Sequence, residues 1–472
     1  MAILRESLLF QWRDIDSADD LSRFLLVRDN LPDARLVDFL EKRRGKGRDD
    51  YPVRPMWNLV LAGVVFQHPS AAALLREASR NPALREACGF NPFPRKRLKK
   101  VEGKWVEVME AEVPSDDAFG RFLALLIEHR SLIDDMFHAC LDELAALLPD
   151  LGEKLAVDSK AIQSAGKPVK DEEKQETPDG RRDLDADWGK KEYKGTRKDG
   201  TPFEKVVTWF GYKLHLLVDS KYEMPLAFKL TKASAADGPE LLPLIEQHEE
   251  RNPETASRAD EVAADKAYDS KENNEALYDD HGIKPVIDNR RLWKEDPEKP
   301  RTLFGDRYDV VSYDEGGRVY CCCPVTGEQR ELAFVGFEKD RGTLKYRCPA
   351  AAFGFVCPGR AKCEKCAPDG VGPFGRVFRV PLSFDRRIFT PIARHTPKWE
   401  NAYDRRTAVE RVNARIDRVL GFELHFIRGQ AKMEMRVSLG LTVLLAMALG
   451  RIRANQADLM RSLTAKVRKT GS

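Results

Sequence analysis

The first 150 residues carry apolar side chains at helical spacing. Leu21, Phe24 and Leu25 follow the capping-box-like string SADD, and the strings RPMWNLVLAGVVF and SAAALLREASR show the same period of three to four residues. A further apolar pattern opens at Pro114 and continues for many turns, with a break expected inside it. The spacing predicts a helical region over residues 1–150. The basic string PRKRLKK inside it is expected to be a loop that touches DNA backbone, or else only a solvated loop.

From Leu155 the pattern changes to short apolar runs of strand length. KLAVDSKAI predicts a strand that ends in Asp158. The next forty residues, 163–204, are rich in Lys, Asp, Glu, Gly and Pro, so we expect a long mobile loop there. After it, two β-rich runs flank the string DSKYEM, which is the composition of a hairpin.

The pattern then alternates between helix and strand. DGPELLPLIEQHEE predicts a helix, ADEVAADKAYDS a strand that ends near Asp265, KENNEALYDDHG a second helix, and IKPVIDN a last strand. The order is strand, hairpin, helix, strand, helix, strand. This order predicts an α/β fold with a mixed sheet covered by helices.

Two further segments complete the chain. Residues 291–392 contain hairpin-like strings and most of the cysteines, which predicts a β-rich insertion. A long helix is predicted after it, with Thr396 as N-cap, Pro397 at its first position and Gly421 just past its end. We therefore expect a helical domain at 1–150, a catalytic domain split into 151–290 and 393–472, and the insertion between its two parts.

Composition narrows the class of protein. The chain has 472 residues, 42% of them hydrophobic and 33% charged, which is enough for two to four domains. Charged residues near Met1 leave no signal peptide, and the longest apolar run, LGLTVLLAMALG, is too short to span a bilayer. We therefore expect a soluble cytoplasmic protein that does not bind a membrane.

The charge is unevenly distributed. The whole chain has a net charge of only +3, but the segment from Arg394 to the end has 16 Lys and Arg against 7 Asp and Glu. A basic C-terminal segment suits local contact with phosphate, although a solvated helix face would show the same bias.

Seven of the nine cysteines fall between Cys321 and Cys366. A cytoplasmic location disfavours disulfides, so the cluster points first to metal. We favour a structural Zn²⁺ held by four cysteines, with Cys321 or Cys323 as replacements; the favoured four are Cys348, Cys357, Cys363 and Cys366. The alternative is a set of reduced cysteines that pack a small β unit.

The string VDSK occurs twice, at Asp158 and at Asp219. Asp219 lies at the tip of the predicted hairpin, where Asp and Ser are ordinary turn residues. Asp158 ends a strand, and Asp265 ends a later one. If those two strands are neighbours, their carboxylates lie side by side at one edge of the sheet. Asp158 is therefore the better candidate for chemistry.

The long helix offers a third acid. Tyr403, Arg406, Glu410 and position 417 are spaced by three, four and seven residues, so they share one helical face. Three carboxylates suit Mg²⁺ or Mn²⁺. Two such ions, about 4 Å apart, clamp the attacking and leaving oxygens of a phosphodiester displacement.

These strings resemble a known family. AVDSK, GYKLHLLVD with LTKASAADGPELLPLI, ADKAYDS and YDRRTAVER are similar to bacterial insertion-sequence transposases with a ribonuclease-H-like DDE domain. The resemblance extends to the subgroup with a Tyr-x2-Arg-x3-Glu-x6-Lys signature and covers most of the chain. It implies Asp158, Asp265 and Glu410 as metal ligands, with Tyr403 and Arg406 on DNA phosphate.

The chain departs from this signature at one position. The lysine would fall at position 417, where the chain has Asp417, and the neighbouring Arg418 is a partial substitute because one residue turns the helix by about 100°. Lys213 and His215 share one face of a strand, and the functional interpretation places them near the acids and the phosphate, against a solvated edge strand as the alternative. Trp293 could stack on an unpaired base, but packing of the insertion is favoured.

The resemblance implies a function and its partners. We expect a transposase that binds the terminal inverted repeats of its own element and joins the cut ends to target DNA. It would act as a homodimer on double-stranded DNA, in the bacterial cytoplasm at the nucleoid. The alternatives are a metal-dependent nuclease without strand transfer and a DNA-binding protein that has lost catalysis, for which Asp417 is the hint.

Overall fold

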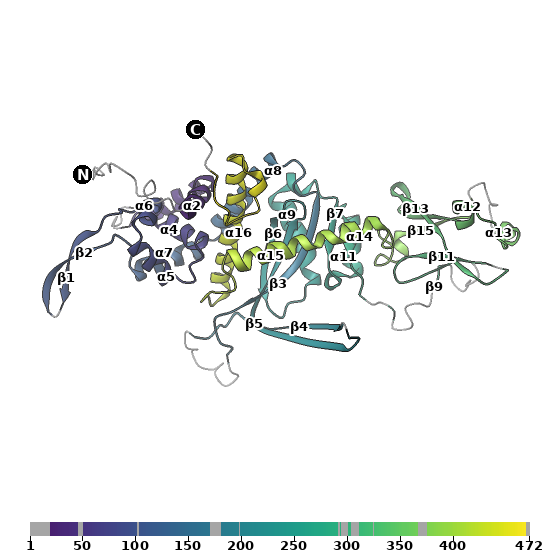
Figure 1. Cartoon of the computed structure of the whole chain (residues 1–472), viewed down its shortest axis with the longest axis horizontal. Helices are drawn as coiled ribbons and strands as arrows, with labels where there is room; N and C mark the ends of the chain where they lie inside the picture. The colour runs from purple at the N-terminus through teal and green to yellow at the C-terminus, as the bar shows by residue number, and fades with distance from the viewer. Residues whose placement is uncertain are drawn as a thin grey trace.

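The computed structural model describes residues 19–45, 51–101, 103–169, 181–197, 199–290, 293, 301–303, 311–323, 325–366 and 375–468. In these residues the molecule is elongated, with a helical region at one end, a sheet in the middle and a β-rich unit at the other end (Figure 1).

Helices form most of the N-terminal region, as the spacing of its apolar residues predicts. They are α2 (Asp19–Asn30), α3 (Ala34–Arg44), α4 (Val53–Val65), α5 (Ala71–Arg80), α6 (Pro82–Cys88), α7 (Asp116–Glu128) and α8 (Ser131–Leu147). The expected break separates α7 from α8. PRKRLKK is not a loop but most of β1 (Arg95–Val101), which pairs with β2 (Lys104–Glu110) in an exposed two-stranded ribbon. Cross-strand backbone hydrogen bonds pair the two strands, and most side chains of the ribbon, apolar ones such as Leu98 and Trp105 included, are exposed.

A mixed sheet lies in the middle of the molecule, which confirms the predicted mixed α/β character of the fold. Its strands lie in the order β6-β5-β3-β7-β8. Their bounds are β3 (Lys154–Gln163), β5 (Pro202–Asp219), β6 (Met224–Lys232), β7 (Glu261–Ala264) and β8 (Lys284–Ile287). Strands β3, β7 and β8 are parallel, and β5 runs antiparallel to β3 and β6. The predicted hairpin is confirmed, because Asp219 of β5 pairs with Met224 of β6.

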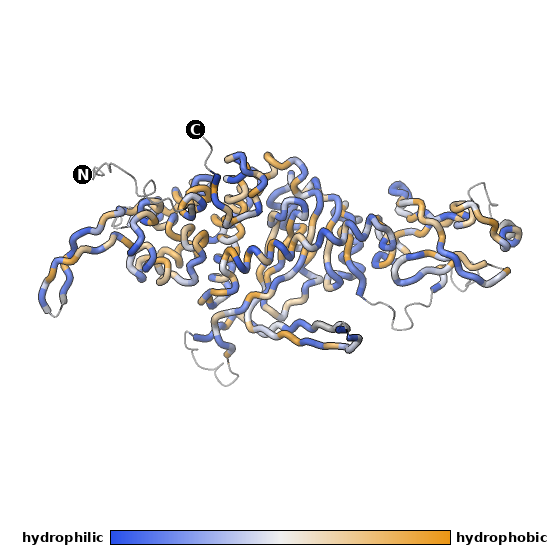
Figure 2. Tube along the Cα trace, viewed as in Figure 1, coloured by the Kyte–Doolittle hydropathy of each residue, from blue (hydrophilic) through white to orange (hydrophobic). Residues whose placement is uncertain are grey.

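The stretch predicted as a long loop contains a second exposed ribbon. Strand β4 (Asp187–Thr196) pairs with the N-terminal half of β5, from Asp187 opposite Gly211 to Thr196 opposite Pro202. Residues 170–180 and 198 of that stretch lie outside the described part. The prediction was wrong over 187–196 and 202–204, because a ribbon solvated on both faces has the polar composition of a loop. Figure 2 shows hydrophilic and hydrophobic residues mixed along it.

Helices cover both faces of the central sheet. On one face lie α9 (Leu241–Arg251) and α11 (Lys271–Asp279), and the short α10 (Pro253–Ala256) follows α9. On the other lie α14 (Pro397–Tyr403), α15 (Thr407–Val419) and α16 (Gln430–Arg453). The predicted long helix begins at the expected N-cap, where Thr396 accepts a hydrogen bond from Trp399 N. It is not continuous, because a 3₁₀ turn over Asp404–Arg406 separates α14 from α15.

Helix α16 is the longest apolar helix in the described part of the chain. Among the described residues it alone has the length and composition of a membrane span, and 89% of its most apolar window is buried inside the protein. It packs against α2, α4 and α8 and joins the N-terminal helices to the sheet. This packing identifies α16 as a core helix.

The β-rich insertion has a hydrophobic core of its own. One sheet contains β9 (Arg301–Thr302), β10 (Val311–Tyr313), β11 (Val319–Cys322) and β12 (Gln329–Glu331). The other contains β13 (Ala333–Glu338), β14 (Thr343–Arg347) and β15 (Val377–Pro381), with α12 (Pro349–Phe353) and α13 (Arg360–Cys366) after β14. Trp293 is only 4% exposed in this core, and the guanidinium of Arg301 lies 4.3 Å from its ring. Packing is therefore the correct interpretation of Trp293.

Candidate active site

Two aspartates lie at equivalent positions of adjacent parallel strands. Asp265 directly follows β7, whereas Asp158 lies inside β3, which does not end there as expected but continues to Gln163 in its pairing with β5. Strand β3 pairs with β7 in parallel up to Val157 opposite Ala264, so Asp158 and Asp265 are the next residues of the same register. Equivalent positions on adjacent parallel strands point to the same face. The sheet therefore places these two carboxylates side by side, as expected if their strands are neighbours.

Asp158 is largely buried, with 15% of its side chain exposed. Burial raises the pKa of Asp158 to about 6, and the negative charge of Asp265 adds to this rise. The backbone N–H of Ser159 donates to Asp158 Oδ1 at 2.8 Å and lowers the pKa of Asp158. The positive charges of Lys191 and Arg406 lower this pKa as well. The carboxylate is thus costly to ionise, and a cation at this edge would stabilise its ionised form.

Asp265 begins the 3₁₀ turn that follows β7. Its Oδ1 accepts the backbone N–H of Ala267 at 2.8 Å, which fixes the carboxylate at the strand end. The buried ring of Tyr268 lies in the same turn. Burial raises the pKa of Tyr268 well above its usual value, and the nearby carboxylates, including Asp158 and Asp265, add to this rise. The phenol therefore stays neutral beside the acids.

The third acid reaches Asp158 through an arginine. Arg406 Nη1 lies 2.9 Å from Glu410 Oε1 and 3.8 Å from Asp158 Oδ2. The guanidinium of Arg406 lies 5.8 Å from the ring centre of Tyr403, and Tyr403 stacks on Trp399 with ring centres 4.9 Å apart. The predicted stripe of Tyr403, Arg406 and Glu410 therefore faces the sheet edge. Glu410 is the most open of the acids, with 52% of its side chain exposed.

The carboxylates do not converge as closely as metal ligands do. Among the residues that the structure describes, no three His, Cys, Asp or Glu side chains are placed to hold a metal ion. For the acids the reason is visible, because Arg406 Nη1 lies between Glu410 and Asp158. The donors still suit a hard divalent cation. Two buried polar atoms near them, Arg406 Nε and Tyr268 Oη, have no hydrogen-bond partner in the described part of the chain, so the site has polar groups left to satisfy.

Asp417, at the position of the signature lysine, is paired. Its carboxylate binds the ammonium of Lys160, and the two side chains are 22% and 13% exposed. Lys160 shares a strand face with Asp158, two residues before it. The positive charge that the signature places on the helix is therefore supplied here by Lys160 of β3, opposite Asp417 of α15. Arg418 is exposed near the C-terminal end of α15.

Lys213 and His215 are not brought to the acids, in contrast to the expectation. Asp158 pairs with Leu216, so the side chains of Lys213 and His215 point to the opposite face of β5. There the ammonium of Lys213 donates to the carbonyl of Ala235 at 2.7 Å and lies 3.0 Å from Asp237. His215 is fully buried, and burial lowers its pKa to about 4. These contacts are structural, in the half of the sheet covered by α9.

Asp219 lies remote from the acids, as its turn position predicts. It pairs with Leu155 near the start of β3, and its carboxylate accepts the backbone N–H groups of Tyr222 at 2.5 Å and Gly152 at 2.8 Å. Its side chain is used to close the turn and to tie it to the segment before β3.

The described cysteines of the insertion gather around one cavity of about 190 Å³, and they include three of the four predicted zinc ligands and both predicted replacements. Cys348, Cys357 and Cys363 line it, and Cys321, Cys322 and Cys323 do so as well. The side chain of Cys366 lies outside the described part. Because the described thiols are not placed to hold a metal ion, the zinc site stays a prediction, which metal analysis of the purified protein tests.

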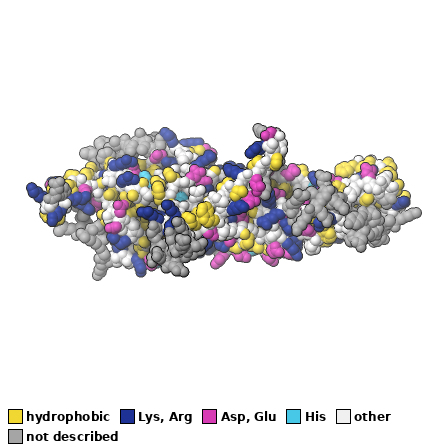
Figure 3. All heavy atoms as spheres, turned by 90° about the horizontal axis from the view of Figure 1, so that it is seen from below, with side chains coloured by type: hydrophobic (Ala, Val, Ile, Leu, Met, Phe, Trp, Pro, Cys, Tyr) yellow, Lys and Arg dark blue, Asp and Glu magenta, His cyan; other side chains and the backbone are white. Residues whose placement is uncertain are grey.

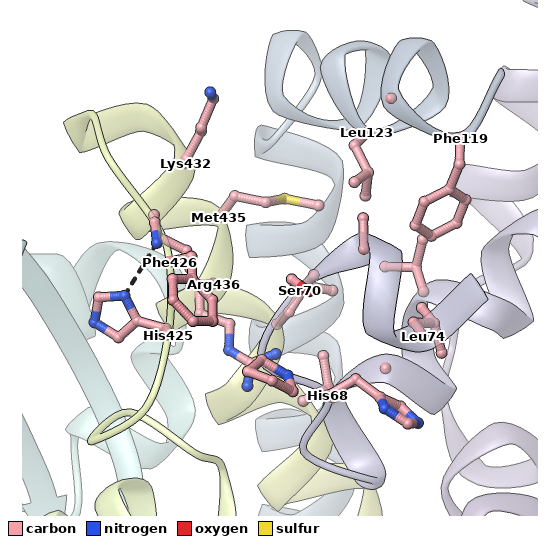
Figure 4. Close-up of a pocket in the computed structure, with 18 of the residues that line it drawn as sticks. His68, Ser70, Leu74, Phe119, Leu123, His425, Phe426, Lys432, Met435 and Arg436 are labelled. Atoms are coloured by element: carbon pink, nitrogen blue, oxygen red, sulfur yellow. Dashed lines mark hydrogen bonds between the residues drawn. The ribbon is translucent and has the colours of Figure 1, made fainter. Parts of the chain in front are cut away.

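A larger cavity, of about 630 Å³, lies between the N-terminal helices and α16 (Figure 4). Leu74, Phe119 and Leu123 form its apolar wall, and Arg436 lies on the other side. Burial lowers the pKa of Arg436 to about 10. None of the lining residues is acidic. The cavity therefore lacks the groups that phosphodiester chemistry needs.

The sheet edge and the facing helix define a class of protein: a mixed α/β domain with acids from three distant parts of the chain on one side of its sheet. In a comparison with known families, residues 150–446 match the family described as Transposase DDE domain. The match covers more than half of the 472 residues, and the chain belongs to this family. It is therefore a transposase with DNA as its substrate. No curated protein and no solved structure matches the chain.

Two residues of this region were missed by sequence reasoning. Lys160 could have been found, because strand alternation places it on the face of Asp158. Lys191 gave no signal, because it belongs to the stretch that was predicted as a loop.

Proposed function

We propose that the chain is the transposase of an insertion sequence, with a ribonuclease-H-like catalytic domain that cuts the ends of its element and joins them to target DNA. The observation that carries this proposal is the placement of Asp158 and Asp265 on adjacent parallel strands, with Glu410 linked to Asp158 through Arg406. The strand order around them, one antiparallel hairpin followed by parallel strands, supports the fold assignment.

Asp158, Asp265 and Glu410 would hold two Mg²⁺ or Mn²⁺ ions, which supply charge neutralisation at the attacking and leaving oxygens. Water attacks the phosphorus at the element end, the bond to the 3′-oxygen breaks, and a 3′-hydroxyl is released. This hydroxyl then attacks a phosphodiester of the target, and the target's own 3′-oxygen leaves. The chain contributes position and charge rather than a covalent intermediate.

The basic side chains near the acids have matching roles. Arg406 binds two carboxylates in the absence of DNA and would exchange them for a phosphate when the acids hold cations. Tyr403, held by its stack on Trp399, and the exposed Arg418 extend this phosphate-binding surface along the helix. Such contacts position the DNA and carry no sequence information.

The N-terminal region is proposed to bind the terminal inverted repeats. Its β1–β2 ribbon supports this role, because five of the seven residues of β1 are Arg or Lys and both strands are exposed. A two-stranded ribbon fits the major groove of DNA. Because two ends must be joined, we propose a homodimer on DNA, which the mass of the protein–DNA complex in solution tests.

The test uses a duplex that carries the element end, with and without Mg²⁺. The unmodified chain should cut this duplex only with Mg²⁺, and Asp265→Asn should bind it equally well but leave it uncut. Transfer of the cut strand to a second duplex distinguishes a transposase from a nuclease. Cleavage by Asp265→Asn at the unmodified rate would contradict the assignment, and binding without cleavage by the unmodified chain would favour a DNA-binding protein.

A further inference from the structure

The β1–β2 ribbon projects from the helical end of the molecule, away from the central sheet (Figure 1). Its two strands contain six Lys or Arg residues against two Glu. The strands pair in an unbroken register, from Arg95 opposite Glu110 to Lys100 opposite Trp105 and beyond. Because directly paired residues of an antiparallel ribbon lie on the same face, this register divides the side chains between two faces.

The two faces differ in burial. The first, called here the open face, consists of six exposed residues: Lys96, Leu98, Lys100, Trp105, Glu107 and Met109. On the second face Val108 and Glu110 are half-buried. Two cations of that second face are already paired, Arg95 with Glu112 and Lys99 with Glu110. The open face is therefore the one that a ligand can reach along its whole length.

The open face has an apolar centre without cover. The side chains of Leu98, Trp105 and Met109 are exposed by 67%, 69% and 59%. Leu98 lies opposite Glu107, and the other two flank Glu107 on β2 at a spacing of two residues. A two-stranded ribbon is marginally stable in water by itself. A partner that covers these three side chains would therefore stabilise it.

Lysines lie at both ends of this apolar centre. Lys100 is opposite Trp105 and has no ion pair among the described residues, and Lys96 is opposite Met109. The ammonium of Lys96 lies 3.3 Å from Glu107, but both side chains are more than half exposed, so this pair is weak. Figure 3 shows Lys and Arg side chains beside hydrophobic ones at this end of the molecule. The face thus suits an anionic partner that also offers apolar contacts.

Size and charge decide between two partners for the open face. Strands rise about 3.4 Å per residue and lie about 4.8 Å apart, so the seven residue pairs form a face of about 240 Å². This is less than a third of the roughly 800 Å² that each partner buries in a standard protein interface. Packing against a second copy would also bring the lysines of both copies together. Duplex DNA has the opposite charge, and its major groove, about 12 Å wide, admits a two-stranded ribbon.

We propose that the open face enters the major groove at the element end and reads the bases of about seven base pairs. The inference rests on the proposed function and deepens it, because it names the surface that distinguishes the element end from other DNA. The three apolar side chains contact thymine methyl groups, and Glu107 between them accepts a hydrogen bond from the N4 amino group of a cytosine. Lys100 and Lys96 bind phosphates beside the groove. Apolar groups and an acid gain nothing from phosphate, so backbone binding alone does not account for this face.

The ribbon offers a matched control. Leu98 and Val106 are both exposed aliphatic residues, but Val106 pairs with Lys99 on the second face. We would compare Leu98→Ala, Glu107→Gln and Val106→Ala in the full chain. Affinity is measured without divalent metal for a duplex that carries the element end and for an unrelated duplex of equal length. A third duplex carries the element end with uracil for thymine, which removes only the methyl groups. Thermal melting checks that each variant is folded.

Leu98→Ala and Glu107→Gln should each lower the preference for the element end by about 10-fold. Their affinity for the unrelated duplex should not fall, because it comes from phosphate contacts. Val106→Ala should stay within about 2-fold of the unmodified chain on both duplexes. The uracil duplex should bind the unmodified chain more weakly than the thymine duplex does, and Leu98→Ala should reduce this difference.

The inference is wrong if Leu98→Ala and Val106→Ala change the preference equally, or if Leu98→Ala weakens binding to both duplexes alike. It is also wrong if the unmodified chain has no preference for the element end. Self-association of the chain without DNA, seen in sedimentation and abolished by Leu98→Ala, would assign the open face to a second copy instead. The proposed function fails separately, if the unmodified chain prefers the element end but does not cut it with Mg²⁺.

Discussion

The two VDSK strings place nearly the same residues in opposite roles. Asp158 lies inside β3, just after the part that pairs with β7, and Asp219 ends β5 at its turn into β6. Both carboxylates are largely buried, and burial raises the pKa of each to about 6. Burial and pKa therefore do not distinguish the two sites.

The difference lies in the partners of each carboxylate. Asp219 accepts backbone N–H groups on both oxygens, from Tyr222 and Gly152, and so its hydrogen-bonding capacity is used by the fold. Among the described residues, Asp158 accepts a short hydrogen bond from the N–H of Ser159 alone and faces Asp265 and Arg406 instead. A buried acid whose neighbours are another acid and an arginine side chain is available for ligands, whereas one held by the backbone is not.

The largest expected effect is on catalysis at the first site. Asp158→Asn should lower the rate of DNA cleavage by about 1,000-fold, because one of the charges at the reacting phosphate is lost. Its free energy of unfolding should change little or rise, since the amide removes the repulsion between Asp158 and Asp265. Cleavage assays and denaturant unfolding of the same preparation measure both. A cleavage rate near that of the unmodified chain would contradict the catalytic role given to Asp158.

A substitution of Asp219 should affect stability rather than catalysis. Asp219→Asn should lower the free energy of unfolding by about 1–3 kcal/mol, because the amide group cannot accept the N–H of both Tyr222 and Gly152. The cleavage rate per folded molecule should stay near that of the unmodified chain. Urea unfolding and an active-site titration measure the two quantities. Loss of activity with unchanged stability would show that Asp219, not Asp158, serves the chemistry.

The raised pKa of Asp158 makes a further prediction about stability. An acid whose pKa is about 6 in the folded state and near 4 in the unfolded state binds more protons when folded. The stabilisation that the protonated carboxyl of Asp158 gives to the folded state is therefore complete below pH 4, and it is lost as the pH rises through 6. The unfolding free energy of Asp158→Asn, relative to the unmodified chain, should thus increase by about 2 kcal/mol from pH 4 to pH 7. A difference that is constant with pH would contradict the raised pKa.

Much of this arrangement can be predicted from the sequence. An apolar run that stops at an acid locates Asp158 and Asp265, and the turn composition assigns Asp219 to the hairpin. The alternation of helices and strands is then compatible with β3 and β7 as parallel neighbours, the condition on which the paired acids depend. These inferences succeed because each depends on a short local pattern with one physical cause.

The remainder depends on register and on long-range pairing. Strand alternation puts Lys213 and His215 on one face, but only the pairing of Asp158 with Leu216 shows that this is the wrong face, and a shift of one residue would reverse it. The position of Lys191 depends on the β4–β5 ribbon, which leaves the sheet at Gly211. No local pattern in the sequence predicts this departure. The 3₁₀ turn at Asp404–Arg406 is equally hidden, because the helical spacing continues through it without Pro or Gly.

The smallest expected effect compares the two lysines of the repeated string. Lys160 binds Asp417 with both side chains mostly buried, whereas Lys221 binds Asp150 with 57% of its own side chain exposed. Because solvent screens the second pair, Lys221→Gln should leave the free energy of unfolding unchanged. Lys160→Gln should lower it by about 1 kcal/mol, since Asp417 loses a partner in a less polar place. Equal urea midpoints for the two variants would mean that Lys160 does not compensate Asp417, and the pairing across α15 and β3 would then lose its support.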